Sequence, residues 1–206
     1  MNYIAIYLAC FFIFLSWLTY EQYKSKKQAQ KESDEFWARE EEANHTRNKD
    51  ISNLPYIRVE ESDLPIADTT DETILSYVEE IKQLIQNPMV DFSEYTNTDL
   101  KLAYGVGNFK TLSGYDETFQ NFLMAMANLA KAYVKAGLTD EAIATYELAI
   151  RLGSHRVSDY EELARLFLQK DKPEKLTELL THVKNSDFPR KEVVTEALKK
   201  VYATYQ

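Results

Sequence analysis

Two glycines, a lysine and a threonine stand close together in the stretch "YGVGNFKTLSGY" and suggest a phosphate-binding loop. In such a loop the backbone N–H groups wrap the phosphates, and a glycine directly before the lysine lets the chain come close enough. Here Phe109 stands directly before Lys110. No strand pattern precedes the glycines to present them, as nucleotide-binding folds require. We therefore expect no nucleotide or other cofactor at Gly105 and Gly107.

The residues that hold metals or act as nucleophiles are few. Cys10 is the single cysteine, which excludes an internal disulfide and any cysteine pair for metal or redox chemistry. The three histidines, His45, His155 and His182, lie far apart in the sequence. No motif places a nucleophile beside a base or two histidines on one helix face. We expect no catalytic or metal-binding residue, no small-molecule substrate and a protein that is not an enzyme.

The charge of the chain argues against nucleic acid as a partner. The formal net charge is −9, and lysine and arginine are not clustered as phosphate neutralisation requires. Acidic residues concentrate in residues 51–115. Either this acidic region is a solvated face or it is a docking strip for a basic partner, and a solvated face is the more common case.

The chain as a whole predicts an all-α fold. It contains five glycines and five prolines in 206 residues, and the alternation that marks strands is nearly absent. With 45% hydrophobic residues it can bury one modest core. We divide it into a transmembrane anchor (residues 1–23), a charged juxtamembrane stalk (24–50), an acidic extended segment with packing helices (51–115) and repeated helical hairpins with a closing helix (116–206).

The anchor is predicted from "MNYIAIYLACFFIFLSWLTY", which contains no charged side chain. Residues 3–20 are long enough to cross a hydrocarbon layer of ~30 Å and would contact the lipid bilayer. A basic segment and a small-residue cleavage site are missing, so a retained single-pass helix is favoured over a cleaved secretion signal. Four aromatic rings are expected at the two membrane interfaces: Tyr3, Tyr7, Trp17 and Tyr20.

Four lysines follow the anchor, and this bias predicts a cell-membrane protein whose C-terminal domain lies in the cytoplasm; they are Lys24, Lys26, Lys27 and Lys31. The stalk has no helix breaker, and a continuous helix and a mobile linker are both open. Phe36 and Trp37 are large rings in this charged stretch. They would pack on the same chain, dock a partner helix or touch the membrane surface, and packing on the same chain is favoured.

The acidic region begins with an extended segment that ends at Pro65. A helix over residues 70–87 follows, with a capping-box spacing at Thr69 and Glu72 and an apolar stripe that includes Ile74 and Ile81. A short helix then ends at Gly105.

From Met126 to Ser154, small and large side chains alternate as two packed helices require. Ala130 and Ala142 are small where two helix axes come close, and Tyr133 and Tyr146 are large where the gap must be filled. Gly137 suits the left-handed turn between the helices, and Thr139 is placed to cap the second.

The same pattern returns more weakly about 34 residues later. Leu163, Ala164 and Phe167 repeat the first helix, Asp171 takes the place of the turn glycine, and Leu176 is bulky where a small residue stood. Ser158 and Glu161 have a capping-box spacing at the helix start. A closing helix near the C-terminus, with Val194, Leu198 and Val201 on one side, would complete the stack.

These two hairpins resemble the tetratricopeptide repeat family, with one clear and one degenerate repeat. They depart from it at Ala130, where the family often has Gly, and at Ser154, where it usually has Pro. The N-terminal half resembles small membrane-anchored bacterial proteins of Gram-positive species, which supplies no function. The family resemblance implies a concave groove, formed by the first helix of each hairpin, that holds a protein or peptide partner. The implied lining residues are Met124, Ala127, Lys131, Val134, Ser158, Glu161, Arg165 and Leu168.

We therefore predict a non-enzymatic, membrane-tethered adaptor or scaffold that mediates protein–protein interaction at the cytoplasmic membrane. The family's carboxylate clamp is not expected, because its two places hold Ala127 and Lys131. The alternative is a chaperone of secretion or envelope assembly, with the repeat domain on the extracytoplasmic side.

Overall fold

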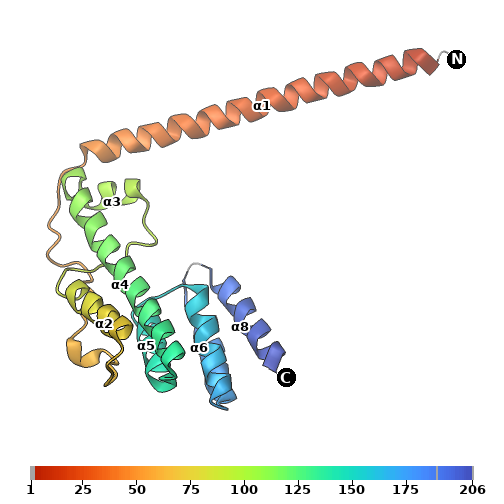
Figure 1. The fold of residues 1–206 in the computed structure, drawn as a ribbon. Coiled ribbons are helices and arrows are strands. Elements are labelled where there is room, and N and C mark those ends of the chain that lie inside the picture. The colour runs from red at the N-terminus through yellow and green to blue at the C-terminus, as the bar shows by residue number, and fades with distance from the viewer. Residues whose placement is uncertain (1–2, 189, 206) are drawn as a thin grey trace. The chain divides into compact units, whose positions relative to one another are not determined.

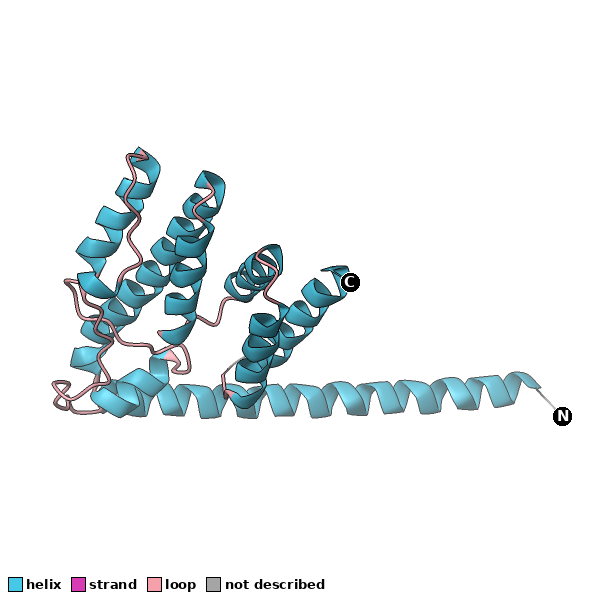
Figure 2. Cartoon of the chain, turned by 90° about the horizontal axis from the view of Figure 1, so that it is seen from below, coloured by secondary structure: helices cyan, strands magenta, loops and turns pink. Residues whose placement is uncertain are grey.

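The computed structural model describes residues 3–188 and 190–205, without the side chains of Ile4, Ala5 and Tyr205. The described chain contains no strand, and its one β-type pairing is an isolated bridge between Ile57 and Met89. This agrees with the all-α prediction. The helices are α1 (Tyr3–His45), α2 (Glu72–Leu84), α3 (Asn97–Tyr104), α4 (Phe109–Ala136), α5 (Thr139–Arg151), α6 (Val157–Gln169), α7 (Pro173–Asn185) and α8 (Lys191–Tyr205), with short 3₁₀ turns at Glu61–Asp63 and Val106–Asn108 (Figures 1 and 2).

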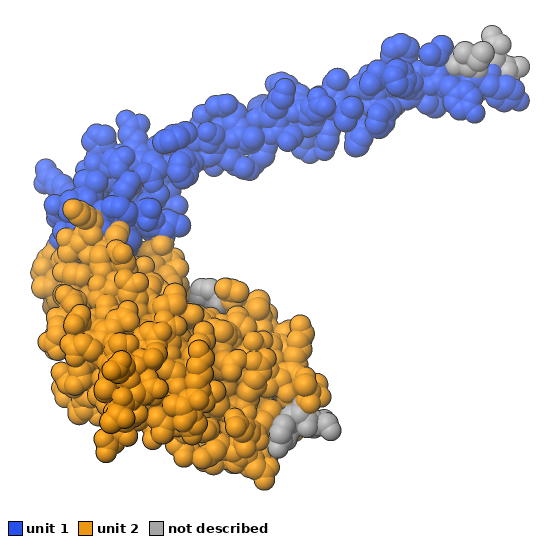
Figure 3. Space-filling model, viewed as in Figure 1, with its two compact units in different colours: residues 1–49, 96–109 blue, residues 50–95, 110–206 orange. Residues whose placement is uncertain are grey.

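The chain forms two compact units (Figure 3). The first contains residues 1–49 and 96–109, and the second contains residues 50–95 and 110–206. The short helix α3 therefore belongs with α1, although the acidic segment that precedes it in sequence belongs with the repeats.

In the first unit, α3 is fastened to the end of α1 by ion pairs. Arg39 Nη2 donates to Asp99 Oδ1 at 2.5 Å, and Lys101 Nζ donates to Glu40 Oε2 at 2.9 Å. The Thr98 hydroxyl also donates to Glu40, and Ala43 is fully buried. The side chains of Glu40 and Lys101 are each only 17% exposed, so this pair is screened less than an ordinary surface pair.

The two glycines after α3 serve chain packing. Gly105 has φ +92°, and a Cβ there would lie 2.5 Å from the carbonyl oxygen of Arg47. The Gly107 N–H donates to Asn48 Oδ1 at 2.8 Å, and the Lys49 N–H donates to the Tyr104 carbonyl at 2.9 Å. The chain after α1 therefore packs so closely on the backbone at Gly105 that no side chain larger than that of glycine fits there.

The predicted transmembrane anchor is wrong. Among the residues that the structure describes, no helix is long and apolar enough to cross a membrane. The helix α1 continues without a break into the charged residues from Glu21 onwards.

The localisation derived from that anchor is corrected with it. A single-pass protein of the cell membrane, with its C-terminal domain in the cytoplasm, requires a spanning helix, which the described chain lacks. The four rings assigned to membrane interfaces are exposed side chains of α1: Tyr3, Tyr7, Trp17 and Tyr20.

In the second unit, α4 and α5 pack as a hairpin with small and large side chains nested. Ala130, Ala142 and Tyr133 are fully buried, and Tyr146 is 1% exposed. Gly137 has φ +76° at the turn, where the Leu138 N–H donates to the Tyr133 carbonyl at 2.9 Å. These are the packing positions and the turn that the sequence pattern predicts.

The second hairpin, α6 and α7, repeats this design with different residues. Asp171 takes the left-handed conformation at φ 55°, and the Lys172 N–H donates to the Phe167 carbonyl at 2.9 Å. Leu163, Ala164 and Leu176 are buried. The helix α8 then packs on both α6 and α7 and buries Val194, Leu198 and Val201.

We expect Gly105→Ala to loosen the junction between α1 and α3. The substitution combines positive-φ strain of ~1–3 kcal/mol with a clash against the backbone of Arg47. Hydrogen exchange of the Lys49 amide, measured on the full chain, should then accelerate by roughly tenfold or more.

The matched control is Gly114→Ala. Gly114 lies inside α4, and a Cβ there meets nothing within 4 Å. This change should stabilise α4 by about 0.5–1 kcal/mol and leave exchange at Lys49 unaltered. Equal exchange rates at Lys49 in both variants would contradict the role assigned to Gly105.

Candidate protein-binding groove

On α4, the residues implied to line the concave face do not all face outward. Met124 is 50% exposed, Val134 is 39% exposed and Lys131 is also exposed. Ala127 is fully buried. Three of the four positions on this helix are therefore accessible to a partner, and Ala127 belongs to the packing of the helix.

On α6, three of the implied residues meet residues of α8 around one groove of about 560 Å³. The two helices lie side by side (Figures 1 and 2). The groove lining is Glu161, Arg165, Leu168 and Gln169 from α6 and Lys200, Val201 and Thr204 from α8. Ser158, the remaining implied position on α6, is exposed at the first turn of the helix.

The α8 residues of the groove were not predicted as site residues. Val201 was expected on the packing side of the closing helix, and it is 9% exposed. Lys200 and Thr204 could not be assigned to partner binding from the sequence. The assignment used positions within the repeats, and α8 lies beyond the second repeat. Lys200 and Thr204 are identified only by the packing of α8 on α6.

The groove has an apolar floor and a charged rim. Leu168 and Val201 are 5% and 9% exposed, so only part of each side chain reaches the surface. Arg165 Nη1 lies 2.6 Å from Glu162 Oε1, whereas Lys200 forms no ion pair with any described residue. Glu161 supplies the one carboxylate of the lining. Such a floor can hold an apolar side chain, and the cations can contact a carboxylate beside it.

The start of α6 is held by a buried polar cluster. Ser154 Oγ donates to Asp159 Oδ2 at 2.6 Å, and both residues are fully buried. Arg156 Nε lies 3.7 Å from Asp159 Oδ1, and its Nη1 lies 3.1 Å from the sulfur of Met124 on α4. The cluster therefore links the start of α6 to α4.

Burial raises the pKa of Asp159 above its ordinary value of 3.8. The Ser154 hydrogen bond, the charge of Arg156, the Ser158 hydroxyl and the charge of Lys131 act in the opposite direction and do not cancel it. The desolvation of the carboxylate is therefore the dominant effect at this site.

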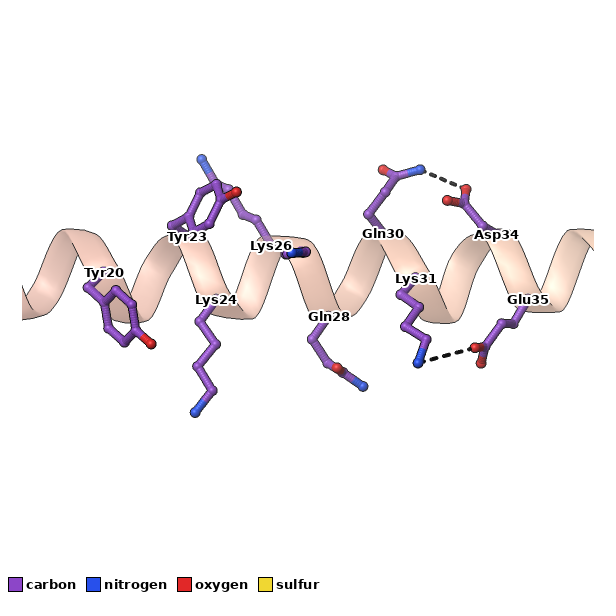
Figure 4. Close-up of a pocket in the computed structure, with 10 residues that line it drawn as sticks. Tyr20, Tyr23, Lys24, Lys26, Gln28, Gln30, Lys31, Asp34 and Glu35 are labelled. Atoms are coloured by element: carbon purple, nitrogen blue, oxygen red, sulfur yellow. Dashed lines mark hydrogen bonds and ion pairs between the residues drawn. The ribbon is translucent and has the colours of Figure 1, made fainter.

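Two other hollows are less suited to a partner. One of about 410 Å³ lies among α5, α6 and α7, and none of the residues that the repeat resemblance implies for partner binding lines it. The other follows α1 between Tyr20 and Glu35. Figure 4 shows that its side chains project from a single helix with no second wall. We assign no site to either hollow.

No group of histidine, cysteine and carboxylate side chains that could hold a metal ion exists within the described residues. Cys10 is exposed on α1. No protein-family model, curated protein or solved structure matches the chain. The function is therefore inferred from the groove and the surfaces of the protein itself.

We expect the stability cost of Asp159 to grow as the pH rises. Below pH 3.8 the carboxyl is protonated in both states, and above it the unfolded chain ionises first because the folded pKa is higher. Ionisation thus favours unfolding until the pH has passed the folded pKa. The free energy of unfolding of Asp159→Asn, minus that of the unchanged protein, should increase across this window.

The measurement is denaturant unfolding of both proteins at a series of pH values upwards from 3.8. The difference between the two proteins cancels the titration of all other groups, and any lost hydrogen bond adds a constant. A difference that shrinks with rising pH would contradict burial as the dominant effect.

Proposed function

We propose that the chain is a non-catalytic binding module of the helical-repeat type, which holds a segment of a partner protein in the groove between α6 and α8. One observation carries the proposal: the groove gathers an apolar floor and two cationic side chains, Arg165 and Lys200, from two different helices. Three of its residues occupy positions that the repeat resemblance assigns to partner binding.

The chemistry of the groove supports a partner segment with one apolar side chain next to acidic residues. The apolar side chain would cover Leu168 and Val201, which are the least exposed residues of the lining. Burial of such an anchor stabilises a complex by about 25 cal/mol for each Å² of apolar surface removed from water. The acidic residues would meet Lys200 and Arg165.

The rim charges have a different role from the floor. An exposed ion pair contributes only about 0–1 kcal/mol, so Arg165 and Lys200 add modestly to affinity. They act on specificity, since a basic segment would be repelled, and on the association rate. Lys131 on α4 is exposed and pairs with no described residue, and it adds a third cation for a longer acidic segment.

We expect the double variant Arg165→Glu/Lys200→Glu to lose the peptides that the unchanged protein selects. Peptides are selected from a displayed library on the full chain, and the strongest is then titrated by fluorescence anisotropy. Selected peptides should combine an apolar residue with acidic neighbours. Their affinity for the double variant should fall by roughly tenfold or more, which corresponds to about 1.4 kcal/mol.

The control is Lys184→Glu, a charge reversal at an exposed lysine on α7 away from the groove. It should leave the affinity within about twofold. Selected peptides that bind the double variant and the control equally well would overturn the assignment of the groove.

A further inference from the structure

Phe36 and Trp37 form an exposed aromatic pair on α1. Their side chains are 53% and 66% exposed, and their rings meet edge to face with centroids 5.3 Å apart. The sequence favours packing of these rings on the same chain, and the structure places them at the surface instead. Both rings are therefore accessible to a partner.

The cover that α3 provides ends one turn before the rings. Arg39 and Glu40 are bound by α3, and Phe36 lies three and four residues before them, on the same side of α1. The eight-residue α3 leaves Phe36 53% exposed. The ring therefore lies beyond the part of α1 that α3 covers.

Carboxylates surround the two rings. Glu32 lies one turn before Phe36, and Asp34 and Glu41 lie one turn before and after Trp37. None of the three forms an ion pair with a described cation. Gln28 donates to Glu32 at 2.7 Å. Gln30 donates to Asp34 at 2.8 Å (Figure 4). The glutamine amides are uncharged, so these hydrogen bonds do not neutralise the carboxylates.

The nearest lysine does not neutralise the patch. Lys31 Nζ lies 3.6 Å from Glu35 Oε1 and is occupied by that carboxylate (Figure 4). Arg39 is occupied by Asp99. The surface is therefore aromatic and anionic at the same time, and its remaining charges are unmatched within the described chain.

We infer that Phe36, Trp37, Glu32, Asp34 and Glu41 form a second contact surface, which binds a basic segment of a partner protein. Lysine or arginine side chains satisfy both features of the surface, since they pair with carboxylates and stack on aromatic rings. Tryptophan is also enriched among the residues that anchor protein interfaces. A second copy of this surface is disfavoured, because it would bring carboxylates against carboxylates.

The test uses Trp37 as its own reporter. The chain has two tryptophans, and Trp17→Phe in the full chain leaves Trp37 as the single one. The probe is a synthetic amphipathic peptide of leucine and lysine, and its counterpart has glutamate in place of lysine. The lysine peptide should shift Trp37 emission to the blue and saturate, and the glutamate peptide should not.

Two further variants test the surface in the same background. Asp34→Asn/Glu41→Gln should weaken the lysine peptide by roughly tenfold, and binding should weaken as salt is added. The control Glu79→Gln/Glu80→Gln removes two exposed charges of α2 and should leave the shift unchanged.

Three results would overturn the inference. The lysine peptide could bind without altering Trp37 emission, which would place it elsewhere on the acidic chain. Both peptides could bind equally, which would exclude a role for charge. The emission could shift with protein concentration alone, which would show that a second copy covers the rings.

Discussion

The nesting of Tyr133 between α4 and α5 is the contact on which the second unit depends. The ring is fully buried and belongs to the same hydrophobic core as Ala130 on α4 and Ala142 on α5. Its hydroxyl donates to the Pro65 carbonyl at 3.0 Å and accepts from the Ala67 N–H at 3.1 Å. One side chain therefore packs the first hairpin and holds the extended segment against it. Tyr146, its large counterpart on α5, has no hydrogen-bond partner among the described residues, so it contributes through its ring alone.

Packing positions could be predicted from the sequence, whereas the N-terminal caps of the helices could not. Small and large residues recur at fixed spacing. This pattern can be read from the sequence because close-packed helices accept only side chains of suitable volume at each position. Caps depend on competition among neighbouring polar groups. Asp71 caps α2 in place of Thr69, and α5 begins at Thr139 without a side-chain cap. Ser154 bonds Asp159 across the turn into α6, a contact five residues apart that no capping-box spacing indicates.

The same limit applies to the groove. Glu161, Arg165 and Leu168 could be predicted because they hold repeat positions on α6, but the α8 wall follows from tertiary packing alone. Ala127 was misplaced because its methyl group is short and the adjacent Met126 and the nearby Leu129 are buried as well. For Phe36 the deciding feature is where α3 begins, because Asp99 in its first turn already meets Arg39 and leaves the ring exposed. Sequence patterns fix which face a residue lies on, but not how far a neighbouring helix extends over it.

The two proposed surfaces carry opposite charge on a chain whose formal net charge is −9. At a distance this net charge repels an acidic segment and attracts a basic one. An acidic segment must therefore reach Arg165 and Lys200 within about one Debye length, ~10 Å at 0.1 M salt, before local attraction exceeds the repulsion. At the groove, added salt screens both the long-range repulsion and the local ion pairs, so the apolar floor has to supply most of the affinity. At Phe36 and Trp37, added salt weakens only the attraction between the carboxylates and a basic segment. The groove thus selects partners mainly by fit, and the aromatic surface selects them mainly by charge.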